Sequence, residues 1–208
     1  MEHRLDYEIL VLGSTFYKDG KEIFSYYIEY LKFDKDTPEF NQINLKNYQD
    51  ALARQAYAVH QLYQYALQDY ALGASLPYVY ISCVHITMNQ NGIFSGYFEN
   101  YMYSGGAHGN LIRTAFTFDS QTGKPRTLCS FMKQPNCLPC ITQYIIQQIR
   151  NSGHESDYFS DYVTLVPQTL HAENFYIKPQ GVVVFFEHYD IAPYVSGIKE
   201  FVIPFYYC

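Results

Sequence analysis

The spacing of hydrophobic and polar positions changes several times along the chain, and each spacing predicts a different kind of element. Residues 6–17 and 21–33 are rich in β-branched and aromatic residues, which favour strands. Between them, Lys18-Asp19-Gly20 supplies a turn in which glycine can adopt positive φ. The two segments are therefore predicted to form a hairpin.

Residues 48–71 have the three- and four-residue spacing of an amphipathic helix. Pro38 and the polar residues 41–44 interrupt the pattern before this segment. We therefore expect the helix to begin after Asn47, as N-cap, and to stop at Gly73. The stripe that should face the core comprises Leu52, Ala56, Val59, Leu62, Tyr63, Ala66, Leu67 and Tyr70.

A second hairpin is predicted from residues 78–89 and 93–103, because Asn91-Gly92 between them is a strong two-residue turn signal. With such a turn, His85 would face Phe98 and Tyr80 would face Tyr103. One face of the hairpin would then carry five tyrosines: Tyr78, Tyr80, Tyr97, Tyr101 and Tyr103.

The rest of the chain alternates less regularly and predicts shorter elements. In order, these are a strand at 111–119, a turn at 120–123, helices at 138–150 and 156–170, a hairpin of 173–177 with 181–186, and a strand at 200–206. Strands and helices are segregated, so the predicted class is α+β with antiparallel sheets. We expect two closely packed halves, 1–107 and 108–208.

The composition indicates a globular chain with an acidic surface. Of its 208 residues, 48% are hydrophobic and 16% charged, and no segment is apolar enough to span a membrane. Residues 1–6 carry three charges and no apolar segment, so no signal peptide is expected. The net charge of −6 argues against nucleic acid and suits a basic partner, although solubility alone explains the same charge. The 23 tyrosines suit both sheet positions and binding surfaces.

The five cysteines give a weaker signal. Cys137-Leu138-Pro139-Cys140 is a single C-x-x-C with no second pair, so it does not support a zinc site. It precedes a helix without a βαβ context, which argues against thioredoxin-like redox chemistry. An adventitious pair or a local disulfide is the favoured interpretation.

Residues 104–109, Ser-Gly-Gly-Ala-His-Gly, are the most informative segment. They lack the Lys-Ser/Thr of a phosphate-binding loop. A hydrolase would need a nucleophile and an orienting carboxylate near His108, and no known triad spacing is present. A structural turn and a recognition loop remain as interpretations.

Residues 185–197 pass from an apolar strand into acidic and aromatic residues and a Pro-Tyr pair. Glu187, His188 and Asp190 have the chemistry of metal ligands, but strand alternation points Glu187 and His188 to opposite faces. A loop that presents Tyr189, Pro193 and Tyr194 is favoured. We predict no catalytic residue, no metal site and no cofactor.

Two segments carry a family resemblance. Tyr103–Gly109 resembles the Tyr-Thr-Gly-Gly-Ala-His-Gly signature of a bacterial two-part extracellular module, with Ser104 in place of threonine. Residues 189–194, with Gly197 and Phe201–Pro204, resemble its closing motif, and residues 118–128 and 174–176 fit the region between. This module, of unknown function in many members, occurs in lysozyme-sensing anti-sigma factors of the anti-sigma-V type and beside some peptidoglycan deacetylase domains.

The resemblance implies a non-catalytic module of the cell envelope that binds lysozyme, with loops entering the lysozyme substrate cleft. Without a membrane helix or a cytoplasmic segment, this chain is expected to bind but not to signal. The partner-binding residues would be Ser104, Gly105, Gly106 and His108 on one loop, and Tyr189, Pro193 and Tyr194 on the other. Two alternatives stay open: a peptidoglycan-binding accessory domain, and a hydrolase that uses His108 with a carboxylate.

Overall fold

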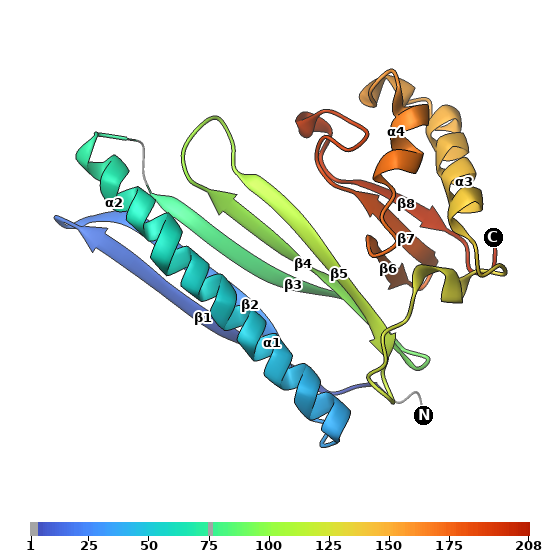
Figure 1. Cartoon of the computed structure of the whole chain (residues 1–208), viewed down its shortest axis with the longest axis horizontal. Coiled ribbons are helices and arrows are strands. Elements are labelled where there is room, and N and C mark those ends of the chain that lie inside the picture. The colour runs from blue at the N-terminus through green and yellow to red at the C-terminus, as the bar shows by residue number, and fades with distance from the viewer. Residues whose placement is uncertain (1–3, 75–76) are drawn as a thin grey trace.

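The computed structural model describes residues 4–74 and 77–208, and within these the strands form two sheets (Figure 1). The five-stranded sheet has the order β1-β2-β3-β4-β5, with bounds Tyr7–Lys18, Lys21–Phe33, Tyr78–Gln90, Ile93–Tyr103 and Asn110–Asp119. The three-stranded sheet has the order β6-β7-β8, with bounds Phe175–Lys178, Gly181–Phe186 and Lys199–Ile203. The helices are α1 (Pro38–Tyr57), α2 (Tyr63–Ala71), α3 (Leu138–Asn151) and α4 (Tyr162–Thr169). The predicted α+β class is confirmed.

One strand pair departs from the expected antiparallel pattern. β2 and β3 run parallel between Phe24 and Ile28, while all other neighbouring pairs of these sheets are antiparallel. Parallel neighbours need a long crossover connection, and the helix between the two hairpins supplies it. The helical segment that the sequence predicted is thus the reason why the sheet is mixed.

The long helix begins ten residues earlier than predicted. Thr37 is the N-cap, with its Oγ1 accepting a hydrogen bond from the Phe40 amide at 3.4 Å, and Pro38 occupies the first turn, where its missing N–H has no cost. Asn44 lies inside α1 and bonds both backbone groups of Phe33, while Asn47 donates to the Leu31 carbonyl. These polar side chains, which predicted a break in the helix, therefore form hydrogen bonds with backbone groups at the end of β2, where β2 is no longer paired with β3.

The predicted stripe of this helix is only partly right. Leu62 and Ala66 are buried, but Leu52 and Ala56 are exposed. The positions that face the sheet are Phe40, Ala51, Ala58, Leu62 and Ala66. A π-helical turn at Ala58–Leu62 adds a residue to one turn, which shifts the buried face. The helix ends at Ala71 as predicted, and Gly73 follows it with φ +75°.

The Asn91-Gly92 hairpin is confirmed, but its register shifts at a β-bulge between Ile86 and Met88. His85 therefore faces Tyr97 instead of Phe98, and Tyr80 faces Met102 instead of Tyr103. A one-residue shift exchanges the two faces of a strand. The predicted five-tyrosine face is wrong: Tyr80 packs under the helix.

The three-stranded sheet is covered on both faces, which explains why all six residues of β7 are buried. α3 and α4 cover one face (Figure 1). On the other face, Tyr176, Val183 and Phe185 pack against Tyr97 and Ala115 of the first sheet. The Ile177 amide also donates to Ser95 Oγ at 2.9 Å, so the two sheets share a buried polar contact.

Two element boundaries in this region differ from the predictions. α4 begins at Tyr162 rather than 156, because the Phe159 amide bonds to the Ile191 carbonyl at 3.0 Å and holds the preceding residues outside the helix. β8 ends at Ile203, because Pro204 has no amide hydrogen for the ladder. The division into halves at residue 107 stays a prediction, and β5 hydrogen-bonds to β4 as the edge of the first sheet.

Candidate functional site

The two loops that the sequence singled out meet in space. The loop 104–109 joins β4 to β5, and the loop 188–195 lies between β7 and β8. Tyr194 of the second loop donates a hydrogen bond of 2.6 Å to the Gly109 carbonyl of the first. We call the surface formed by residues 104–109 and 188–195 the paired-loop surface.

The glycines of the first loop are required by backbone geometry and by packing. Gly105 and Gly106 both have φ of +93°, a conformation that L side chains rarely adopt. At Gly109, a Cβ atom would lie 2.4 Å from the ring of Tyr101. The loop therefore owes its path to these three positions.

Tyr194 is the centre of a three-ring stack. The His108 ring lies 3.8 Å from it at an interplanar angle of 17°, and the His188 ring lies 4.4 Å from it at 24°. Two rings this close cannot share one face of Tyr194, so the histidines lie on opposite faces. The stack fixes both loops to one another.

The other predicted residues surround this stack. Tyr189 has φ of +69° and an exposed fraction of 59%, with its ring 5.8 Å from that of Tyr194. Pro193 precedes the short helical turn Tyr194–Ser196. Ser104, Gly106 and His108 are exposed, whereas Gly105 is half-buried against Tyr78. The structure thus brings the predicted residues to one face, while their binding role stays a prediction.

The three residues weighed as metal ligands have separate contacts. Glu187 Oε1 accepts from the Arg113 amide at 2.7 Å, and the Glu187 amide donates to Asp190 Oδ2 at 2.8 Å. His188 stacks on Tyr194. Throughout residues 4–74 and 77–208, no group of three His, Cys, Asp or Glu side chains is placed to hold a metal ion.

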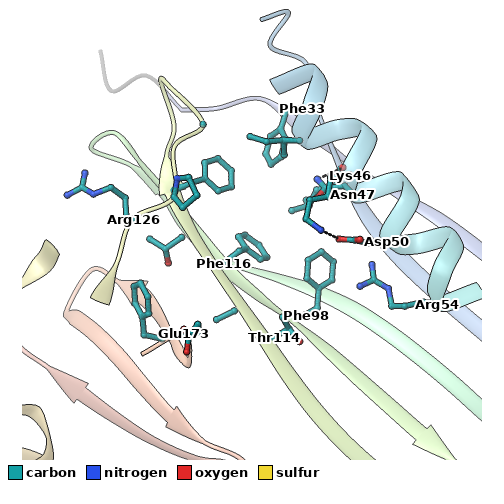
Figure 2. A pocket seen from close by; sticks show the side chains of 18 residues that line it. Phe33, Lys46, Asn47, Asp50, Arg54, Phe98, Thr114, Phe116, Arg126 and Glu173 are labelled. Carbon is teal, nitrogen blue, oxygen red and sulfur yellow. Dashed lines mark hydrogen bonds and ion pairs between the residues drawn. The ribbon is translucent and has the colours of Figure 1, made fainter. Parts of the chain in front are cut away.

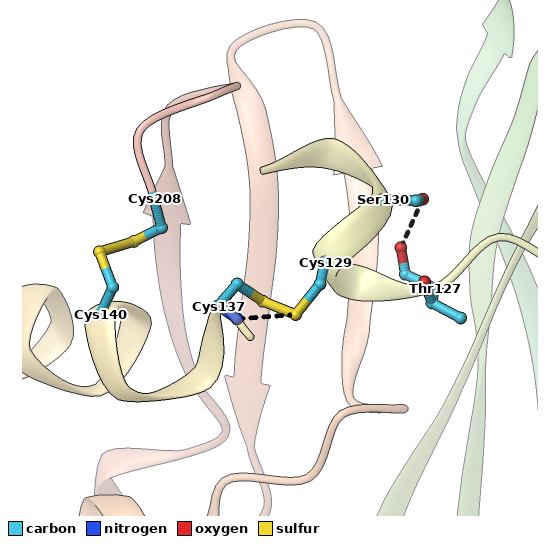
Figure 3. Close-up of a disulfide and its surroundings, with 6 residues drawn as sticks. All are labelled: Thr127, Cys129, Ser130, Cys137, Cys140 and Cys208. Carbon is cyan, nitrogen blue, oxygen red and sulfur yellow. Dashed lines mark hydrogen bonds between the residues drawn. A yellow bond between two sulfur atoms is a disulfide. The ribbon is translucent and has the colours of Figure 1, made fainter. Parts of the chain in front are cut away.

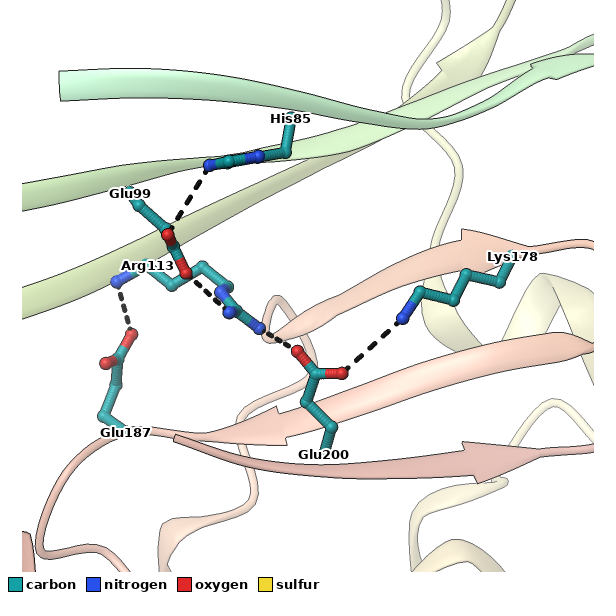
Figure 4. A network of polar contacts seen from close by, with 6 residues as sticks. All are labelled: His85, Glu99, Arg113, Lys178, Glu187 and Glu200. Carbon is teal, nitrogen blue, oxygen red and sulfur yellow. Dashed lines mark hydrogen bonds and ion pairs between the residues drawn. The ribbon is translucent and has the colours of Figure 1, made fainter. Parts of the chain in front are cut away.

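A polar network lies behind the paired-loop surface and joins the two sheets. Figure 4 shows Arg113 of β5 between Glu99 of β4 and Glu200 of β8. The Arg113 side chain is only 8% exposed, and its guanidinium lies 4.0 Å from the centroid of the Tyr97 ring. His85 and Lys178 extend the network through Glu99 and Glu200 respectively.

The carboxylates of this region have opposite pKa shifts. Burial raises the pKa of Glu187 above its ordinary 4.5, and burial likewise raises the pKa of Asp190 above 3.8. Burial acts in the same direction on Glu200, but hydrogen bonding from Arg113, together with the charges of Arg113 and Lys178, outweighs it and lowers the pKa of Glu200 below 4.5. Glu200 is therefore an ionised anchor between the sheets.

The cysteines form two disulfides that differ from the expected pair (Figure 3). Cys129 bonds to Cys137, and Cys140 bonds to Cys208, so the two cysteines of the C-x-x-C motif do not pair with each other. Cys137 is the N-cap residue of α3 and bonds back to Cys129, whereas Cys140 lies in the first turn of the helix. Cys83 is the remaining cysteine and is unpaired.

The geometry around His108 gives no support to the hydrolase alternative. His108 Nδ1 lies 3.0 Å from the Gly109 carbonyl oxygen, and the ring is exposed. No ion pair joins His108 to a carboxylate among the residues that the structure describes. A general base in a triad would need such an orienting partner.

Sequence reasoning missed His188 as part of the stack and Arg113 as the centre of the network. Arg113 gave one signal, as a lone cation among the apolar residues of a predicted strand. Its partners Glu99 and Glu200 are 14 and 87 residues away, so only the packing of the two sheets identifies them.

Two family models match different parts of the chain. Residues 17–111 match the family model described as deacetylase PdaC, and residues 131–206 match that of a protein of unknown function, DUF3298. The chain therefore contains two consecutive parts, one similar to the PdaC model and the next similar to the DUF3298 model. This confirms the two-part resemblance.

Two solved structures share the fold. A DUF3298 family member from Bacteroides fragilis has a TM-score of 0.64 and 16% identity, with 96% of this chain and 90% of that chain covered. A DUF3298 family protein from Pseudomonas aeruginosa has a TM-score of 0.68 and 17% identity, with 97% and 91% covered. No curated protein matches the chain. At these identities the likeness establishes the fold alone.

Proposed function

We propose that this chain is a recognition module of the cell envelope that binds a basic, wall-active protein of the lysozyme type through the paired-loop surface. The observation that carries the proposal is the stack of His108, Tyr194 and His188. It fixes two loops from distant parts of the sequence into one rigid aromatic surface. Rigid loops lose little conformational entropy on binding, and exposed tyrosine provides a large contact area.

Charge supports a basic partner. The chain has a net charge of −6, and complementary charge steers association and raises the association rate. Binding of this kind weakens as salt rises, because exposed charges are screened.

The disulfides support a location outside the cytosol. Cys129–Cys137 and Cys140–Cys208 are structural cross-links, and such bonds persist in oxidising compartments. In residues 4–74 and 77–208, every helix is too short or too polar to cross a membrane.

The test is calorimetric titration of the chain with hen-type lysozyme, together with an assay of lysozyme activity. We expect saturable binding that inhibits the lysozyme, and we expect Tyr189→Ala to weaken it about tenfold or more. Tyr17→Ala is the matched control, because Tyr17 is 62% exposed and lies near the tip of the first hairpin, compared with 59% for Tyr189. Equal loss in both variants, or no binding at all, would show that the proposal is wrong.

A second candidate is a peptidoglycan-binding accessory domain, which the match of residues 17–111 to deacetylase PdaC favours. Retention on purified cell wall in the absence of any protein partner distinguishes it. If Tyr189→Ala is retained on cell wall as well as the unmodified protein is, and lysozyme does not bind, the second function is favoured.

A further inference from the structure

A cleft of about 480 Å³ lies between α1 and the helix-facing side of β4 and β5 (Figure 2). α1 packs on β2, so this side of the outer strands is left partly open. The segment Gly123–Arg126 and residues 173 and 175 close the opposite wall. Small-molecule sites in proteins have volumes of about 300–1,000 Å³, so the cleft is of that size.

The floor of the cleft is aromatic. Phe98, Phe116 and Phe118 line it, and their rings contact one another at centroid distances of 5.5 and 6.5 Å through Phe116. Phe98 and Phe116 are half-buried, so parts of their rings are open to the cleft. Such a floor favours the apolar body of a ligand.

Arg54 is the cation of this cleft that lacks an anion. Its guanidinium lies 5.0 Å from the centroid of the Phe98 ring, and its Nε is buried without a hydrogen-bond partner. Among the residues that the structure describes, no carboxylate forms an ion pair with Arg54. Burial lowers the pKa of Arg54 below its ordinary value, in agreement with its incomplete solvation.

The other two cations of the lining are already engaged. Lys46 Nζ pairs with Asp50 at 2.8 Å. The Arg126 guanidinium lies 5.1 Å from the centroid of the Phe131 ring, and Figure 2 shows it directed away from the phenylalanine floor. A half-buried cation without a partner is costly, so a single anionic group at Arg54 would complete the site.

A second cavity, of about 370 Å³, adjoins the first and also includes Arg54 in its lining. Asn100 and Ile112 line it, and Asn100 Oδ1 is buried without a hydrogen-bond partner. Arg54 therefore lines both cavities, and its guanidinium is within reach of a ligand that occupies the cleft of about 480 Å³.

We propose that this cleft binds an amphiphilic carboxylate, meaning a small molecule with one carboxylate and an aryl or alkyl body. The carboxylate accepts hydrogen bonds from the Arg54 guanidinium, and the apolar body lies on Phe98 and Phe116. A phosphate dianion would carry more charge than the one unpaired cation balances, and a neutral ligand would leave Arg54 uncompensated. No lining residue belongs to the paired-loop surface, so the site is independent of the function proposed above.

The test compares 4-phenylbutyrate and octanoate with the uncharged 4-phenyl-1-butanol, by calorimetry or by ligand-observed NMR at millimolar concentration. We expect saturable binding of at least one of the two acids and weaker binding of the alcohol. Arg54→Gln should raise the dissociation constant of that acid about tenfold or more and leave that of the alcohol unchanged. Arg126→Gln is the matched control, since it removes a cation of the same lining whose guanidinium is turned away.

Thermal unfolding without ligand establishes that each variant is folded. If Arg54→Gln does not fold, Arg54→Lys, which keeps the charge, replaces it and should retain a preference for the acid over the alcohol. The proposal is wrong if neither acid binds, if acid and alcohol bind equally to the unmodified protein, or if Arg126→Gln weakens binding as much as Arg54→Gln.

Discussion

The two sheets of this protein are stabilised in different ways. The five-stranded sheet has strands of 10 to 13 residues and a core dominated by phenylalanine and tyrosine, such as Phe24, Phe33, Phe40 and Tyr80. The three-stranded sheet has strands of 4 to 6 residues and a largely aliphatic core, and both disulfides belong to its region. We infer that the long strands and the long helix bury enough apolar surface to be stable without cross-links. The short strands bury less surface and are stabilised by the disulfides.

We expect the largest effect from removing the disulfide that stabilises the smaller sheet. Cys140→Ala with Cys208→Ala opens a loop closed over 68 residues, and the lost loop-closure entropy should lower the free energy of unfolding by about 4 kcal/mol. The matched control is Cys129→Ala with Cys137→Ala, whose loop spans 8 residues and should cost about 2.5 kcal/mol. Denaturant unfolding measures both. Equal costs would mean that loop closure does not explain the role of the cross-links.

The second prediction concerns the aromatic core of the larger sheet. Phe40 is fully buried, and its ring contacts those of Phe33 and Phe118 at 5.6 and 6.3 Å. Phe40→Ala should lower the free energy of unfolding by about 3 kcal/mol through lost burial and the cavity left behind. Leu45→Ala on the same helix, at a position 57% exposed, should change it by less than about 0.5 kcal/mol. A small change in the free energy of unfolding for Phe40→Ala would argue that other contacts of the helix, and not the Phe40 ring, stabilise its packing on the sheet.

The smallest expected effect concerns the network between the two sheets. Glu200→Gln should lower the free energy of unfolding at pH 7 by about 1 kcal/mol, because Glu200 accepts a charged hydrogen bond from Arg113 and is one-third exposed. The pKa of Glu200 is lowered in the folded state, so its contribution is present above pH 4.5 and is lost as the pH falls through the folded-state pKa.

Unfolding measured between pH 7 and pH 3 tests this last prediction. The difference between the unmodified protein and Glu200→Gln should shrink as the pH falls. Glu173→Gln, at an exposed position without an ion pair among the described residues, should show no such change. A difference that is independent of pH would assign the loss to packing instead of charge.

Local signals predicted the elements of this fold well. Lys18-Asp19-Gly20 and Asn91-Gly92 predicted the β1–β2 and β3–β4 hairpins, because positive φ at these positions is a property of the residues themselves. The predictions were wrong where the local structure depends on a contact with residues distant in the sequence. Asn44 and Asn47 read as a helix boundary, yet they are helical and bond to β2. The bulge after Ile86 moved Tyr80 to the other face, and nothing in the hairpin sequence marks it.

The two loops of the candidate site could be predicted from the sequence, but their contact with each other could not. The glycines and His108 of one loop, and Tyr189, Pro193 and Tyr194 of the other, were identified separately from the sequence. That Tyr194 lies between His108 and His188 requires the second sheet to pack against the first, which sequence spacing does not encode. The Arg54 cleft was not predicted for the same reason: its walls come from a helix, two strands and a later segment of the chain.

The Cys140–Cys208 bond also determines how the molecule would carry tension. All three strands of the smaller sheet, the whole of α4 and all of α3 after its first three residues lie between these two cysteines in the sequence. A pulling force between the larger sheet and residue 208 would pass along the chain to residue 140 and then directly across the disulfide. Residues 141–207 would lie outside that load path, so the smaller sheet would not be unravelled strand by strand, and its short strands need no mechanical strength of their own.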